Sequence, residues 1–157
     1  MKKILIFLIA LLLTIIFTGC NNQNTISMIS YEIDEYEVND YSDANMTIIE
    51  ETISNKELTI ELNYFGKDEG RTGAWYTIFV YEENEWNEMS YIIDGNIGWV
   101  MIAYIVKNNQ ASQMSINWEW LYGELSTGRY LIVKQFTNYR GPDDFDNYYL
   151  ACEFTII

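Results

Sequence analysis

The sequence predicts an all-β domain, and three observations support this. Apolar and polar residues alternate with a spacing of two in repeated short segments between residues 46 and 157. Clusters of Gly, Asn and Asp, which supply the backbone angles that tight turns need, separate these segments. No segment there keeps a helical repeat for three turns. We therefore expect about eight antiparallel strands in this part of the chain.

The expected strands follow one another closely. A first, weaker strand is expected at 46–53. The clearest strand spans 58–64, where apolar residues occupy the even positions and polar residues the odd ones, as in a sheet with one wet face. The others are expected at 75–82, 86–91, 99–106, 113–120, 129–136 and 147–156. Turn residues predict the connections at 66–73, 82–85, 94–96, 107–110 and 138–144, and the single proline, Pro142, lies in the last of these.

About 110 residues in seven or eight strands fit an immunoglobulin-like antiparallel β-sandwich, with a closed barrel as the alternative. The segment LSTGRY at 125–130 favours the sandwich. In such folds a tyrosine that enters the penultimate strand folds its hydroxyl back onto the backbone a few residues upstream. Tyr130 is placed to form this tyrosine corner, and Ile132 would then point inward. The alternative is an ordinary tyrosine at a strand start.

The N-terminus is typical of a bacterial lipoprotein signal. Lys2 and Lys3 precede an apolar run over residues 4–17, which is followed by Thr18, Gly19 and Cys20. The run is shorter than the roughly 20 residues that a membrane-spanning helix needs. We expect residues 1–19 to be removed and Cys20 to carry lipid, which places the protein on the extracytoplasmic face of the cell membrane. An ordinary secretory signal is the alternative.

The charge of the chain restricts its partners. Nine basic residues face 23 acidic ones, a net charge of −14. Removal of residues 1–19 would take away Lys2 and Lys3 and leave 7 − 23 = −16. Such a body is repelled by nucleic acid phosphates and by anionic lipid headgroups, so neither is expected to bind it electrostatically.

Residues 20–45 are rich in Asn, Asp, Glu and Tyr and are interpreted as an acidic tether between the lipid and the domain at 46–157. A second interpretation stays open for part of this segment. Tyr31, Ile33, Tyr36 and Val38 have the spacing to lie on the domain as an extra strand.

No catalytic residue, cofactor or metal is expected. The chain contains no histidine, which removes the commonest general base and metal ligand, and it has neither a GxSxG elbow nor a complete phosphate loop. The acidic clusters at 82–85 and 143–146 match no defined calcium or glycosidase spacing. With Cys20 committed to lipid, Cys152 has no intramolecular partner, and its place in a period-two pattern predicts that it packs as a small hydrophobe.

Aromatic residues supply the candidate binding face. If Tyr76, Ile78 and Val80 point inward, then Trp75, Phe79 and Tyr81 line the opposite face of the same strand. Exposed aromatic side chains often mark surfaces that bind proteins or sugars. In the alternative interpretation, the acidic tether or a neighbouring strand covers this face.

The chain also resembles a known family. WEWLYGELSTGRYLIVKQF at 118–136 and YYLACEFTI at 148–156 resemble the closing half of a bacterial Ig-like domain found in small lipoproteins of Gram-positive-type bacteria. LTIELNYFGKDEGRTGAWYTIFVYEENEWNEM at 58–89 resembles that family's opening strands. The resemblance covers roughly residues 46–157 and implies architecture and location, but no catalytic residues.

Three classes of function follow from these expectations. The leading one is a membrane-anchored, non-catalytic Ig-like module that contacts a protein or an envelope component. The second is a proteinase inhibitor, because some bacterial inhibitors share an Ig-like fold and the loop at 138–146 has the length to enter a protease cleft. The third is a carbohydrate-binding module that uses the aromatic face.

Overall fold

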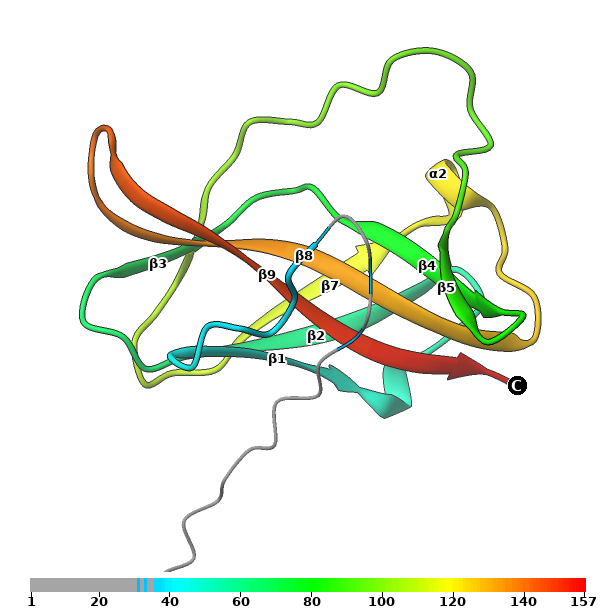
Figure 1. Ribbon diagram of the computed structural model, residues 1–157, viewed down its shortest axis with the longest axis horizontal. Coiled ribbons are helices and arrows are strands. Elements are labelled where there is room, and N and C mark those ends of the chain that lie inside the picture. The colour runs from blue at the N-terminus through cyan, green and yellow to red at the C-terminus, as the bar shows by residue number, and fades with distance from the viewer. Residues whose placement is uncertain (1–30, 32, 34–35) are drawn as a thin grey trace, which may run out of the picture.

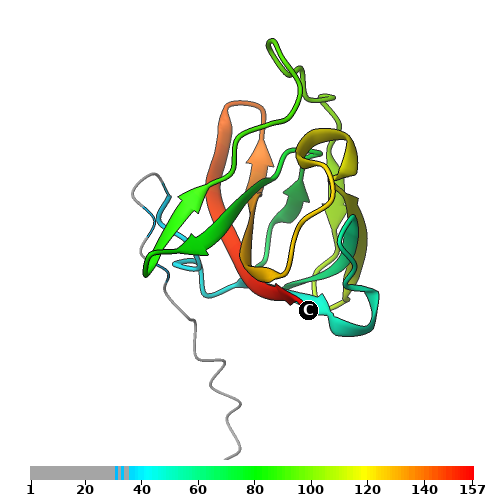
Figure 2. The ribbon, with the colours of Figure 1, turned by 90° about the vertical axis from the view of Figure 1, so that its right-hand side faces the viewer.

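The computed structural model describes residues 31, 33 and 36–157. The expected signal peptide and Cys20 lie outside the described residues. The chain forms two antiparallel β-sheets that pack face to face, which confirms the predicted all-β sandwich (Figure 1). Figure 2 views the two layers from one end.

The smaller sheet has the strand order β1-β2-β7. Its strands are β1 (Ala44–Ile49), β2 (Glu57–Tyr64) and β7 (Ser112–Asn117). A 3-10 turn, η1 (Glu50–Thr52), connects β1 to β2. The four even-numbered side chains of β2, from Leu58 to Tyr64, are all buried, whereas its odd-numbered ones are partly or fully exposed. The predicted alternation of this strand is therefore confirmed.

The larger sheet is built around β8 (Gly128–Gly141), which pairs along its length with β9 (Asp144–Ile156). On its other side, β8 pairs first with β4 (Thr77–Glu82) and then with β3 (Glu69–Thr72). The outer strands are β5 (Glu85–Glu88), next to β4, and β6 (Tyr104–Val106), next to β3. Residues 73–76 thus form a break between two strands that share one side of β8.

Aromatic side chains join the two sheets in the core. Trp118 is completely buried, and its indole N–H donates a hydrogen bond to the carbonyl of Asn55 (3.0 Å). Its ring packs against Phe154, which in turn stacks on Tyr130 with 5.5 Å between ring centroids. Burial of rings of this size supplies much of the driving force that holds the layers together.

The predicted turn at 66–73 is wrong in its second half, where the structure has strand β3. Gly70 lies in this strand, paired with Val106 and Asn138, at a place where there is no room for a side chain. A Cβ atom at Gly70 would lie 2.9 Å from the carbonyl oxygen of Val106 and 3.0 Å from the rings of Phe136 and Tyr64. Glycine inside a strand often marks such a close approach.

The region from 86 to 120 also differs from the prediction. β5 ends at Glu88, β6 contains only residues 104–106, and no strand forms between them. β7 ends at Asn117, and a short helix, α2 (Glu119–Tyr122), follows. The apolar content of residues 89–103 resembles that of a strand, but no neighbouring strand pairs with this segment. The turn between β4 and β5 is correctly predicted: Glu83 and Asn84 both have positive φ, as a type I′ hairpin turn requires.

Candidate binding groove

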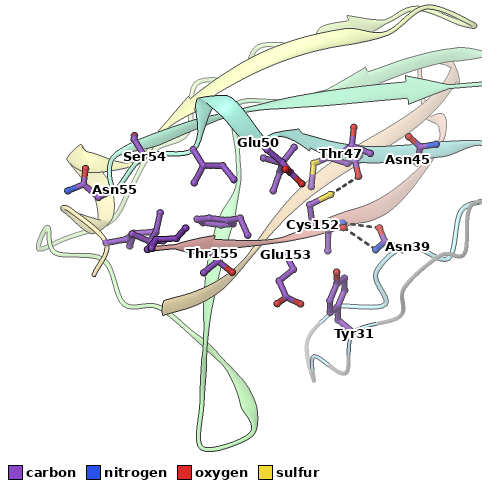
Figure 3. Close-up of a pocket in the computed structure, with 18 of the residues that line it drawn as sticks. Tyr31, Asn39, Asn45, Thr47, Glu50, Ser54, Asn55, Cys152, Glu153 and Thr155 are labelled. Atoms are coloured by element: carbon purple, nitrogen blue, oxygen red, sulfur yellow. Dashed lines mark hydrogen bonds between the residues drawn. The ribbon is translucent and has the colours of Figure 1, made fainter. Parts of the chain in front are cut away.

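A large hollow lies between β1 and β9, the edge strands at the open side of the sandwich (Figure 3). Its volume is about 1180 Å³. Apolar side chains from both strands and from the following segments line it, together with exposed polar ones at the rim. The larger apolar members include Met46, Ile48, Ile53, Leu125, Phe154 and Ile156.

Both strands that flank the groove have an edge without a neighbouring strand. In the described part of the chain, β1 pairs only with β2, and β9 pairs only with β8 except for a single bridge between Val38 and Tyr149. Such edges carry backbone N–H and C=O groups that can pair with another extended chain. The groove therefore combines an apolar floor with hydrogen-bonding walls.

Asn39 shows how the chain itself uses one part of this edge. Its side-chain amide donates to the carbonyl of Ala151 (3.1 Å) and accepts from the N–H of Ala151 (2.9 Å), while its backbone N–H donates to Tyr149 (2.8 Å). The backbone of Ala151 therefore points away from β8. Because alternate residues of an antiparallel strand point the same way, the backbones of Glu153 and Thr155 face outward too.

Cys152 closes the floor of the groove. Its thiol donates a hydrogen bond to the carbonyl of Met46 (2.6 Å) and so links β9 to β1. Burial raises the pKa of this thiol to about 12, because the thiolate would lose its hydration. The side chain packs beside the core cluster, as the period-two pattern of the last strand predicts. A neutral, half-buried thiol of this kind is a packing group rather than a nucleophile.

The rim of the groove is polar and acidic. Glu50 is exposed there, and Glu153 forms an ion pair with Arg129 (2.7 Å). Tyr31 lies beside Glu153 and contributes its ring to the same wall (Figure 3). An extended segment with apolar side chains and a neutral or positive charge would fit both the floor and the rim.

The expected aromatic face is covered by the chain's own N-terminal segment. Phe79 is buried and Trp75 is half-buried beneath Tyr36, whose ring centroid lies 6.2 Å and 5.9 Å from theirs. Val38 completes this second apolar cluster on the outer face of the larger sheet. This arrangement agrees with the alternative interpretation, in which residues of the acidic segment cover this face.

Tyr81 lies at the end of the same face and is partly exposed. Its ring packs against Trp86 (5.0 Å between centroids), and the guanidinium of Arg129 lies 4.3 Å from its centroid. Arg129 also reaches the ring of Trp86 (5.8 Å). These contacts place a cation and two aromatic rings together rather than leaving an open aromatic platform.

Tyr130 has the geometry of a tyrosine corner. It lies near the start of β8, and its hydroxyl donates to the carbonyl of Ser126, four residues upstream, at 2.9 Å. Gly128 packs under its ring, with only 3.3 Å between the ring and an ideal Cβ position on that glycine. The contact ties the crossover between the sheets to the strand that follows it.

The loop expected at 138–146 is a strand hairpin instead. Residues 138–141 pair with residues 144–146, and only Pro142 and Asp143 form the turn. Arg140 forms ion pairs with Asp144 and Asp146 across the hairpin, at 2.8 Å each. Within the described residues, no group of three acidic or cysteine side chains has the arrangement of a metal site.

Lys134 is a notable residue that the sequence analysis missed. It is almost completely buried, and its ammonium donates to the carbonyls of Gly73 (2.7 Å) and Trp75 (3.1 Å) in the break between β3 and β4. Burial lowers its pKa to about 8. The signal was available, since period two from Ile132 to Phe136 places Lys134 on the inward face.

The two packed antiparallel sheets and the tyrosine at the start of the penultimate strand define an immunoglobulin-like β-sandwich. A family model described as a bacterial Ig-like domain matches residues 40–154, and the chain belongs to this family. The predicted resemblance is thus confirmed. Comparisons with curated proteins and with solved structures gave no match. None of the helices among the described residues is long and apolar enough to span a membrane.

Proposed function

We propose that this protein is a non-catalytic, extracytoplasmic binding module, held at the cell membrane by lipid on Cys20. The groove between β1 and β9 would receive an extended segment of a partner protein. The observation that carries this proposal is the pair of unpaired strand edges on either side of an apolar floor. Since an Ig-like fold serves many functions, the proposal rests on this groove rather than on the fold.

The lipid anchor is supported by the sequence alone. A cationic start, a short apolar run and Thr-Gly before Cys20 suit export and lipid transfer. Two or more acyl chains would hold the protein stably, because each buried methylene contributes about 0.8 kcal/mol. Labelling with a radioactive fatty acid tests this directly: the wild type should carry label and float with membranes, and Cys20→Ser should do neither.

The binding mode would be strand addition, in which the partner continues the larger sheet beyond β9. Thr155 offers outward-facing backbone groups for this, whereas Asn39 and the hydroxyl of Tyr31 already bind the backbones of Ala151 and Glu153. Apolar side chains of the partner would enter the groove between Ile48 and Phe154. The acidic rim favours a partner segment without acidic residues.

The variant Thr155→Pro tests whether a partner binds the backbone of β9, and it does so without disrupting the fold. The N–H of Thr155 points away from β8, so Thr155→Pro should leave the sheet intact, as prolines on edge strands do. The proline would remove one donor and block an incoming strand. Thr155→Ala, which removes the side chain but keeps the donor, is the matched control.

The expected result is that a partner recovered from solubilised membranes with the wild type is also recovered with Thr155→Ala, but not with Thr155→Pro. Equal recovery with both variants would exclude strand addition at this edge. The thermal unfolding of each variant must stay cooperative for the comparison to hold.

The two alternative functions receive less support. An inhibitory loop at 138–146 would have to act as a tight hairpin with a two-residue turn. A sugar platform at Trp75 and Phe79 would require Tyr36 to leave the face that it covers. The groove, in contrast, can receive a ligand without any rearrangement of the chain.

A further inference from the structure

The loop between β5 and β6 contains the only Asp-Gly pair in the chain. Asp94 is followed by Gly95, whereas none of the other aspartates and none of the asparagines precedes a glycine. The pair lies within residues 89–103, which form no strand and which Figure 1 shows as a long loop that leaves the sheet after β5. The backbone nitrogen of the residue after an aspartate can attack the aspartate carboxyl group. Glycine hinders this attack least, because it has no side chain.

The loop is fixed on both sides of this pair. Before the pair, the backbone N–H of Ile92 donates a hydrogen bond to the carbonyl of Leu121 in α2 (2.9 Å). After the pair, the side chains of Ile97 and Trp99 pack against the core cluster. Residues 93–96 therefore form a short bridge between two anchored points.

The bridge itself has no such contacts. Residues 93–96 are all exposed, and neither their backbone groups nor their side chains form a hydrogen bond with another described residue. The carboxylate of Asp94 forms no ion pair with any described residue either. Because no hydrogen bond has to break first, the backbone here can move into the geometry of attack.

Gly95 has the conformation and the space that ring closure needs. Its φ is +103°, a backbone region that residues with a side chain rarely adopt. A Cβ atom built on Gly95 would meet no heavy atom within 4 Å. The described surroundings of this glycine therefore leave room for a five-membered ring.

We propose that Asp94 and Gly95 form a site of spontaneous isomerisation to isoaspartate. The backbone nitrogen of Gly95 attacks the side-chain carboxyl carbon of Asp94, and a C–N bond forms. The carboxyl hydroxyl and the N–H proton leave together as water. Water then adds to the α-carbonyl carbon of the resulting succinimide and breaks the original bond between that carbon and the nitrogen. The water released in the first step is thus balanced by the water consumed in the second, and no oxidant or cofactor takes part.

The product changes the loop and leaves the rest of the fold in place. The peptide linkage now runs through the side chain of Asp94, so the main chain gains one methylene group and the α-carboxylate becomes the free acid. The open space around Gly95 takes up the extra atom. None of residues 89–103 lines the groove between β1 and β9, so the modification is independent of the proposed function.

The test follows the appearance of isoaspartate in the purified full-length protein during incubation at neutral pH. Peptide mapping with electron-transfer fragmentation locates the modified residue, because the β-linkage gives fragments of distinct mass. Asp143 is the internal control, since it is exposed in a tight turn but is followed by Asp144 rather than by glycine. Asp94→Glu is the matched variant, because its longer side chain would have to close a six-membered ring.

The expected result is that isoaspartate accumulates many-fold faster at position 94 than at position 143, and that the Asp94→Glu variant forms none at position 94. A synthetic peptide of residues 90–98 gives the rate without the fold. The rate in the folded protein should lie within a few-fold of the rate in this peptide, because no hydrogen bond holds the bridge in the described chain.

Two results would overturn the proposal. A folded protein that reacts many-fold more slowly than the peptide would mean that the fold holds the bridge and protects the pair. Equal accumulation at positions 94 and 143 would mean that the glycine and its open surroundings do not select the site.

Discussion

Lys134 gives the sharpest prediction about stability, because a buried amine makes the stability of the fold depend on pH. Its pKa is lowered to about 8 in the folded protein, against roughly 10.4 for an unfolded lysine. Between these two values the unfolded chain binds more protons than the folded one. The free energy of unfolding must therefore rise as the pH rises through this window.

The size of the effect follows from the shift. One pKa unit corresponds to 1.36 kcal/mol, so the contribution of Lys134 to stability should improve by about 2 to 3 kcal/mol between pH 7 and pH 10. Burial of Cys152 acts in the opposite direction, because its raised pKa costs stability above a pH of about 8.5. The stability of the wild type alone would therefore mix the two effects.

The assay compares the wild type with Lys134→Met, which keeps the length of the side chain and removes the titration. Urea unfolding of both proteins, followed by tryptophan fluorescence at several pH values, gives their difference in free energy. That difference should shift in favour of the wild type by about 2 to 3 kcal/mol from pH 7 to pH 10. A difference that does not change with pH would refute the burial of Lys134, because Cys152 is the same in both proteins.

Three further predictions concern the packing. Tyr130→Phe should lower the free energy of unfolding by about 0.5 to 1.5 kcal/mol in urea titrations, because it removes the hydrogen bond to Ser126; no loss would mean that the bond contributes nothing. Gly70→Ala should cost about 1 to 3 kcal/mol by the same method, whereas Gly98→Ala, with open space around it, should be nearly neutral. Tyr36→Ala should uncover the outer aromatic face, lower the melting temperature and red-shift the tryptophan emission; an unchanged spectrum would contradict the covering role of Tyr36.

The strands that could be predicted from the sequence are those with one buried face and one solvent-exposed face. β2 is the clearest case, since the alternation from Leu58 to Tyr64 reports the packing directly. The turn at Glu83 and Asn84 could also be predicted, because a two-residue hairpin depends on local chemistry. The alternation and the turn residues both depend on neighbouring positions in the chain, so a single sequence is enough to predict them.

Features that depend on distant partners could not be predicted in this way. Gly70 belongs to a strand because β6 and β8 pair with it, and these strands are distant in the sequence. Residues 89–103 have the composition of strands but lack a neighbour to pair with. The groove depends on β1 and β9 lying together, and these strands are about a hundred residues apart in the sequence.

Site-specific photo-crosslinking at the groove tests the central claim most directly. A photoreactive amino acid would replace Thr155 at the edge of β9, or Gln113 on β7 as the control, in the lipidated protein on its native membrane. The account predicts that position 155 crosslinks to one protein partner through an extended segment of its chain, and that position 113 does not. Crosslinking from both positions alike, or from neither, would contradict a binding site between β1 and β9.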